Sequence, residues 1–231
     1  MTGRVAVVTG GAGALGASIC RRFLTAGATV CIPYVVPPEV ERLRTETPAD
    51  QLPRLHTEPA DVLDEAAFGV FLKHVRERHR RVDVLVNVVG GFAGGDLAST
   101  SLAEWQRLID LNLTSAVIGC KSVLADMTAA RYGRIVNISS RAVVPPAGGF
   151  IAYTVAKAAV ITLTQALAQE VRAHGITVNT VLPSTMDTEA NRRAMPDADR
   201  SGWVSPDAVA DVIALLASDS AGAITGAAIP V

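Results

Sequence analysis

Two side chains, Tyr153 and Lys157, have types and a spacing that could transfer a proton. They stand four residues apart, so a helix would place both on one face. A phenol with an ordinary pKa of about 10 is a poor base at neutral pH, but a nearby ammonium favours the phenolate and lowers that pKa. The pair could therefore act as a general acid or base between an alcohol and a carbonyl. The spacing alone is commoner in surface pairs without a function.

A serine pair, Ser139-Ser140, ends an apolar run and precedes Tyr153 by thirteen residues, counted from Ser140. A hydroxyl at this place could hold a substrate oxygen beside the phenol. The alternative is that the Ser140 hydroxyl caps the turn at the end of a strand, which is a common use of serine.

A glycine-rich turn lies near the N-terminus, where the segment from Thr9 to Gly16 reads TGGAGALG. A chain that turns sharply from a strand into a helix, close to a pyrophosphate, needs residues without a Cβ. The N–H groups and the dipole of the following helix then attract the anion. A glycine-rich connection without a ligand is the alternative, but the position between a first strand and a first helix favours a dinucleotide.

The end of the second predicted strand should face the adenosine ribose. An acidic residue there would bind the 2′-hydroxyl of NAD, and an arginine would accommodate the 2′-phosphate of NADP. The sequence has Tyr34-Val35-Val36 instead, and the glycine turn carries no basic residue. The choice between NAD and NADP is therefore open at the level of sequence.

These residues need a scaffold, and short β-branched runs alternate along the chain with longer segments of helical period. The predicted strands are 5–9, 29–34, 55–58, 82–89, 135–139, 176–182 and 227–231. Helices are predicted at 14–26, within 37–53, around Phe68, around Trp105, at 153–172 and at 207–216. Strands that are apolar on both faces indicate a parallel sheet covered on both sides. We expect an α/β fold, a single Rossmann-like doubly wound sheet of about seven strands with helices on both faces.

Composition limits the class of protein. The chain has 231 residues, is 49% hydrophobic and carries a formal net charge of −1, which favours one domain over 1–231 and neither nucleic acid nor a membrane surface as partner. The three cysteines, Cys20, Cys31 and Cys120, lack metal-ligand spacing and suggest buried thiols in a reducing compartment. No metal is therefore expected. No signal peptide and no purely apolar run of 18 residues is found, so we expect a cytoplasmic protein.

In order and spacing, these motifs resemble the short-chain dehydrogenase/reductase family through nearly the whole chain. The cofactor turn matches with Ala14 in place of the middle glycine, and the segment after the fourth strand reads Asn87-Val88-Val89-Gly90. The other matches are Asp61 followed by Val62, Asn112, Ser140, Tyr153 and Lys157, and then Pro183 and Thr188 with Ser184 replacing a glycine.

The resemblance implies a role for each matched residue. Tyr153 would give a proton to the alkoxide in reduction or take one from the alcohol in oxidation. Lys157 would bind the nicotinamide ribose and lower the Tyr153 pKa, and Ser140 would orient the carbonyl. Asn112 would hold a water that relays protons to Lys157. The alternative for Asn112, a helix kink or a buried amide bonded to the backbone, is compatible with that role. The residues expected to contact NAD or NADP are Gly10, Gly13, Leu15, Gly16, Tyr34, Asp61, Val62, Asn87, Gly90, Tyr153, Lys157, Pro183, Met186 and Thr188.

A narrower resemblance concerns two loops, residues 90–95 and 182–199, which are similar to those of dihydropteridine reductase. That enzyme lacks the serine that stands here at Ser140 and has an acidic residue where Tyr34 stands. The broader interpretation is an NAD(P)-dependent oxidoreductase for a small carbonyl or alcohol substrate. The alternatives are pterin reduction and a non-catalytic dinucleotide-binding sensor or partner subunit. The family also implies a homodimer or homotetramer, built on the apolar helices that hold Asn112 and Tyr153.

Overall fold

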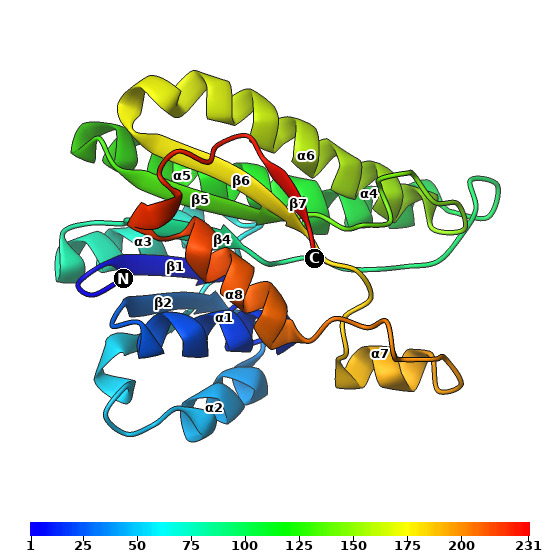
Figure 1. Ribbon diagram of the computed structural model, residues 1–231, viewed down its shortest axis with the longest axis horizontal. Coiled ribbons are helices and arrows are strands. Elements are labelled where there is room, and N and C mark those ends of the chain that lie inside the picture. Colours follow the sequence, from blue (N-terminus) through cyan, green and yellow to red (C-terminus); the bar gives the residue numbers. More distant parts are fainter.

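The fold is built on one parallel sheet. The computed structural model describes residues 1–231, and its strands lie in the order β3-β2-β1-β4-β5-β6-β7 (Figure 1). The strands are β1 (Val5–Thr9), β2 (Thr29–Tyr34), β3 (Leu55–Pro59), β4 (Val84–Asn87), β5 (Gly133–Ile138), β6 (Ile176–Leu182) and β7 (Ala228–Pro230). Every neighbouring pair is parallel. The predicted fold class is confirmed.

Helices cover both faces of this sheet because its central strands are buried on both sides. They are α1 (Ala14–Thr25), α2 (Pro37–Glu46), α3 (Glu65–His79), α4 (Leu102–Ile109), α5 (Ser115–Ala130), α6 (Ile151–Val171), α7 (Glu189–Ala194) and α8 (Pro206–Leu216). One buried cluster joins α1, α2 and α8 to the sheet, and a second joins α3, α5 and α6 to its other face. Figure 1 shows these two helical layers on opposite sides of the strands.

Two departures from the predicted elements have local causes. Strand β4 is shorter than predicted at both ends, where side chains enter the pairing: the Asp83 carboxylate accepts a hydrogen bond from the Val5 amide, and Thr9 Oγ1 accepts one from the Val88 amide. The segment around Asn112 is one turn of π-helix, Asp110–Thr114, between α4 and α5. A π-helical turn thus interrupts the α-helical hydrogen bonding at Asn112, and turns of this kind are frequent at functional sites.

Two helical stretches, Leu102–Ala130 and Ile151–His174, are long and apolar enough to cross a membrane by length and composition. Neither stretch contains a purely apolar run of 18 residues, which is why no membrane span is predicted from the sequence. In the fold both stretches pack against the sheet, where Cys120, Val123 and Leu167 belong to one buried cluster. Helices packed on the sheet of an α/β fold meet the same criterion, so the criterion is weak support for a membrane span.

Candidate active site

The candidate residues come together at the carboxyl ends of the strands, the edge where ligands bind in open α/β sheets. Gly90 follows β4 and marks the point of convergence. A Cβ built there would lie 2.8 Å from Asn112 Oδ1 and 3.2 Å from Lys157 Nζ. Residues from three separate elements therefore meet at one place, and only glycine leaves room for them.

Lys157 lies within α6 and is buried, with 5% of its surface exposed. Its ammonium donates a hydrogen bond of 2.9 Å to the carbonyl of Ile138, at the end of β5. Burial disfavours the charged form and lowers the pKa of Lys157 to about 8. A lysine with this pKa can gain and lose a proton near neutral pH.

Tyr153 lies one helical turn before Lys157, and its pKa differs from the sequence-based expectation. Burial raises the pKa of the Tyr153 phenol, while a hydrogen bond with Ser140 lowers it by less. The Lys157 ammonium, which is bonded to Ile138, is not among the causes of the shift. The expectation that Lys157 lowers this pKa is therefore wrong for the protein without its ligands, because desolvation dominates.

Ser140 contacts both the turn after β5 and the Tyr153 phenol, so it can cap the turn and also hold a substrate oxygen. Its Oγ accepts a hydrogen bond of 3.2 Å from the Ala142 amide, as a cap of the turn after β5. The same hydroxyl forms a hydrogen bond with the Tyr153 phenol and lowers its pKa. Since a hydroxyl accepts and donates at once, the turn fixes the Ser140 oxygen while its proton serves Tyr153, and a substrate oxygen could compete for that proton.

Asn112 is buried and fixed through its amide. Its Nδ2 donates to the carbonyls of Leu108 and Gly91, each at 2.9 Å, and its Oδ1 accepts from the Gly91 amide at 3.2 Å. The prediction that the Asn112 amide bonds to the backbone is confirmed. The geometry holds Oδ1 close to the Lys157 ammonium at the Gly90 point.

The glycine turn has the conformation that a dinucleotide site requires. Gly10 has a φ of +64°, a value that favours glycine, and a side chain at Gly16 would collide with the Gly10 carbonyl. Ala14 is exposed at the first residue of α1, which explains why a methyl group is tolerated there. No side chain caps α1 at Gly13, so its first N–H groups remain available to an anion.

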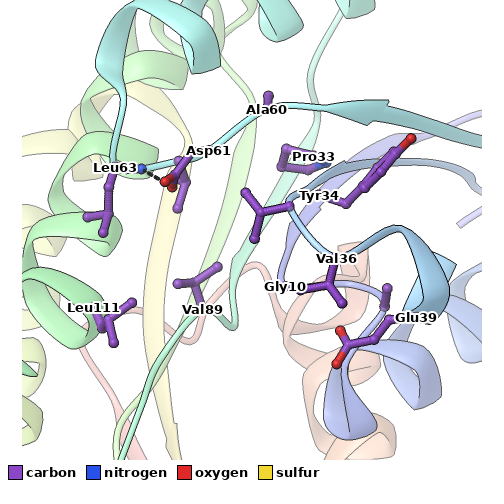
Figure 2. A pocket seen from close by; sticks show the side chains of 13 residues that line it. Gly10, Pro33, Tyr34, Val36, Glu39, Ala60, Asp61, Leu63, Val89 and Leu111 are labelled. Atoms are coloured by element: carbon purple, nitrogen blue, oxygen red, sulfur yellow. Dashed lines mark hydrogen bonds between the residues drawn. The ribbon is translucent and has the colours of Figure 1, made fainter.

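A cavity of about 180 Å³ opens beside this turn (Figure 2). Four of its residues, Gly10, Tyr34, Asp61 and Val62, were predicted to contact the cofactor. The cavity is otherwise mostly apolar, and the remaining lining residues are Ala12, Pro33, Val35, Val36, Glu39, Ala60, Leu63, Val89 and Leu111. A mostly apolar cavity next to a glycine turn could hold the adenine and ribose of a dinucleotide.

Other predicted contacts lie elsewhere. The Asn87 side chain is in the core, where its Nδ2 donates to Asn137 Oδ1 at 2.8 Å, so a contact of this residue with the cofactor would have to come from its main chain. The Leu15 side chain is also buried in the core.

The segment after β6 supports its own loop. The Pro183 carbonyl accepts a hydrogen bond from the Arg141 amide, and Thr188 Oγ1 accepts one from the Asn191 amide as the cap of α7. Met186 forms a bridge with Val204. These residues border the candidate site through the loops that they shape.

Sequence reasoning missed two residues of the site, Glu39 and Phe150. Glu39 lines the cavity from the first turn of α2. The Phe150 ring lies 6.2 Å from the Tyr153 ring, and Phe92 lies 5.1 Å from the same ring. The predicted ribose contact lies at the strand end, Tyr34, whereas Glu39 approaches from α2. The position of Phe150 depends on contacts between loops, which leave no periodic pattern in the sequence.

Comparisons with known proteins agree with this geometry. Residues 4–199 match the family model described as short chain dehydrogenase. The chain is 34% identical over 232 residues to (2S)-[(R)-hydroxy(phenyl)methyl]succinyl-CoA dehydrogenase subunit BbsD of Thauera aromatica, covering 96% of this chain and 92% of that protein. It is equally identical to the acetoacetyl-CoA reductase of Paracoccus denitrificans, with 96% and 94% covered. The crystal structure of levodione reductase superposes with a TM-score of 0.92 at 25% identity, covering 100% and 96%.

Proposed function

The chain belongs to the short-chain dehydrogenase family and is an NAD(P)-dependent oxidoreductase, and we propose that Tyr153 is its general acid or base. The reaction is the reduction of a small-molecule carbonyl compound, or the oxidation of the corresponding alcohol. The observation that carries the proposal is the convergence of Asn112 and Lys157 on Gly90, with Tyr153 and Ser140 beside them.

The proton chemistry follows from the burial of Tyr153. Its pKa is raised, so the phenol is protonated at neutral pH and can give its proton to the developing alkoxide oxygen. The Ser140 hydroxyl, fixed by the Ala142 amide, holds the carbonyl oxygen in line with that proton. When bound, the nicotinamide supplies a hydride to the carbonyl carbon in reduction and accepts one in oxidation.

Lys157 and Asn112 serve the second half of the proton path. The pKa of Lys157 is about 8, so this group can return a proton to Tyr153 after each turnover. Asn112 Oδ1 faces the same point and can hold a water between Lys157 and solvent. The remaining ammonium hydrogens of Lys157 can bind ribose hydroxyls.

The cofactor would lie along the carboxyl edge of the sheet. The glycine turn and the free N–H groups of α1 suit the pyrophosphate, and the cavity with Tyr34, Asp61 and Val62 suits the adenosine. Relatives named as a meso-2,3-butanediol dehydrogenase and an acetoacetyl-CoA reductase support a carbonyl or alcohol substrate.

The apolar helices α5 and α6 support a homo-oligomer. Val117 and Val155 lie on these helices and are 39% and 42% exposed. Burying such residues against a second copy would remove apolar surface from water. Light scattering should give a mass of two or four chains, and a mass of 24.1 kDa would refute the oligomer.

The test of the proposed function is the oxidation of NADH and NADPH by the purified protein with a panel of ketones, diketones and quinonoid pterins. We expect turnover of at least one carbonyl and a loss of about a hundredfold or more in Tyr153→Phe. Binding of the cofactor without turnover of any carbonyl, with Tyr153→Phe indistinguishable from wild type, would favour the non-catalytic sensor instead.

A further inference from the structure

Three aromatic rings gather at the reacting end of the candidate site. Phe92 and Tyr153 lie edge to face with centroids 5.1 Å apart, and Phe150 lies 5.6 Å from Phe92. Phe92 is 63% exposed, an unusual state for a phenylalanine that contacts a buried catalytic candidate. A large apolar side chain exposed at the mouth of a site commonly marks a ligand-binding surface.

The rings are held in place by a bridge between two loops. Gly95, in the loop after β4, accepts a hydrogen bond from the Ile151 amide, and its own amide donates to Gly149 in the loop before α6. Phe92 and Phe150 are carried by these two loops. Because the loops are bonded to each other directly, the positions of the Phe92 and Phe150 rings relative to each other are fixed.

The chemistry of both loops is uniformly apolar. Residues 90–95 read GGFAGG and residues 143–151 read VVPPAGGFI. Neither segment contains a charged or hydrogen-bonding side chain. An apolar substrate group placed against these side chains would remove apolar surface from water, and no side chain of either segment offers a charge or a hydrogen bond to a polar one.

We propose that Phe92 and Phe150 form a subsite for an aromatic ring attached directly to the reacting carbonyl or carbinol carbon. This inference rests on the proposed function and names its substrate class. A flat aryl group can lie against the edges and faces of both rings while its carbonyl oxygen reaches Tyr153 and Ser140. Hydride is added to the carbonyl carbon and the proton of Tyr153 to its oxygen, so the aryl ketone becomes an aryl carbinol.

The experiment compares acetophenone with cyclohexyl methyl ketone, which has the same carbon skeleton and a puckered ring. One aromatic contact of this geometry is worth about a two- to tenfold preference. We therefore expect kcat/KM for acetophenone to exceed that for cyclohexyl methyl ketone by about tenfold from two contacts. Phe92→Leu and Phe150→Leu should each reduce this ratio to about one third, mainly by raising KM. Leu97→Ala is the control, since it removes an exposed apolar residue on the same loop.

Saturation-transfer NMR with the protein and NAD⁺ gives a readout without turnover. Acetophenone ring protons should receive strong saturation, and Phe92→Leu should weaken binding while Leu97→Ala does not. Equal rates for both ketones, or a ratio unchanged in both leucine variants, would overturn the aromatic subsite and leave the proposed reaction intact. The absence of any reduction, with Tyr153→Phe like wild type, would instead refute the reaction.

A second inference comes from the cavity at the other end of the site. Its only charged lining residues are Glu39 and Asp61, and no arginine, lysine or histidine is among them. Asp61 already accepts a hydrogen bond from the Leu63 amide. The Glu39 carboxylate has no ion pair or hydrogen bond within the chain, and Figure 2 shows it on the glycine-turn side of the cavity.

Tyr34 and Arg42, the polar side chains nearest to Glu39, are directed elsewhere. Figure 2 shows the Tyr34 ring directing its hydroxyl away from the cavity. Arg42, three residues further along α2, donates to the Ala12 carbonyl at 3.3 Å and does not line the cavity. Glu39 is thus the one lining carboxylate that accepts no hydrogen bond within the chain, whereas Asp61 already holds the Leu63 amide through Oδ1.

We infer that Glu39 accepts a hydrogen bond from the ribose 2′-hydroxyl and makes the protein selective for NAD over NADP. The carboxylate would replace, from α2, the acidic residue that other dinucleotide folds place at the end of the second strand. A 2′-phosphate at the same place would face Glu39 and Asp61 without a cation, and like charges at close range repel strongly.

Fluorescence titration of the protein with NADH and NADPH tests this selectivity by binding alone. We expect NADH to bind at least about tenfold more tightly, and Glu39→Gln to weaken NADH while strengthening NADPH. Glu41→Gln removes the same charge from an exposed position of the same helix and serves as control. Equal affinities, or tighter binding of NADPH that Arg42→Gln abolishes, would overturn the inference and assign the selectivity to Arg42.

Discussion

The ammonium of Lys157 donates a hydrogen bond of 2.9 Å to the main-chain carbonyl of Ile138, the last residue of β5. A second bond runs in the opposite sense, from Ser139 Oγ to the Lys157 carbonyl at 2.7 Å. Helix α6 and strand β5 are therefore joined at the level of the site by two buried bonds. The position of Tyr153, one turn away on α6, depends on this junction.

The buried charge of Lys157 predicts a dependence of stability on pH. The folded pKa is lowered from 10.5 to about 8, so the unfolded chain binds more protons between these values and stability rises with pH there. The difference corresponds to about 3 kcal/mol. The unfolding free energy of wild type, relative to Lys157→Met, should increase by roughly this amount between pH 7 and about 10.5.

Urea denaturation at both pH values, without cofactor, measures this difference. The lost bond to Ile138 affects Lys157→Met equally at both, so it cancels in the comparison. Lys73→Met, which changes an exposed lysine, should follow the wild-type profile. Parallel profiles for wild type and Lys157→Met would show that the buried lysine keeps an ordinary pKa.

The raised pKa of Tyr153 predicts opposite pH profiles for the two directions of the reaction. Reduction uses the protonated phenol and should stay level through neutral pH, whereas oxidation uses the phenolate. Because burial raises the pKa, oxidation should accelerate by up to about tenfold per pH unit between about pH 6 and 8. Steady-state kcat in both directions checks this, and an oxidation rate independent of pH would contradict it.

The two adjacent serines should separate function from stability. Ser140→Ala removes the hydroxyl that faces Tyr153, and we expect kcat to fall by about a hundredfold with little change in unfolding free energy. Ser139→Ala removes the buried bond to Lys157 and should cost about 1–2 kcal/mol. Chemical denaturation and kcat/KM measured on both variants test the contrast. Loss of stability in Ser140→Ala alone would assign that serine to the turn.

The sequence predicts the sheet well because burial leaves a simple pattern. Strands β1, β2 and β6 have the predicted bounds, since short runs rich in β-branched and apolar residues mark strands that are largely buried on both faces. The short-range spacing of Tyr153 and Lys157 also survives, because both lie on one helix. Such features depend on neighbours along the chain, which the sequence displays directly.

Features that depend on distant packing could not be predicted. Asn87 matches a motif position, but its side chain turns toward Asn137 on the neighbouring strand. The pKa of Tyr153 is set by burial, which spacing to Lys157 does not disclose. Glu39 has the expected chemistry for a ribose contact but approaches from α2, so a search at the strand end misses it.

Two glycines provide a final, opposed pair of predictions. A Cβ at Gly90 would lie 2.8 Å from Asn112 Oδ1 and 3.2 Å from Lys157 Nζ, whereas a Cβ at Gly69 in α3 would meet nothing within 4 Å. Gly69→Ala should stabilise the protein by about 0.5–1 kcal/mol, since alanine favours a helix interior. Gly90→Ala should displace Asn112 and Lys157 and lower kcat/KM by about tenfold or more, because misplaced catalytic groups lose orientation.

Thermal unfolding and steady-state kinetics, measured on both glycine variants, separate an effect on stability from an effect on catalysis. Gly69→Ala should raise Tm and keep wild-type kcat/KM, because α3 lies away from the candidate site. Gly90→Ala should show its main effect in kcat, with a shifted pH profile for the Lys157-dependent step. If Gly90→Ala kept full activity and an unchanged pH profile, Asn112 and Lys157 could not be working from the positions that converge on Gly90.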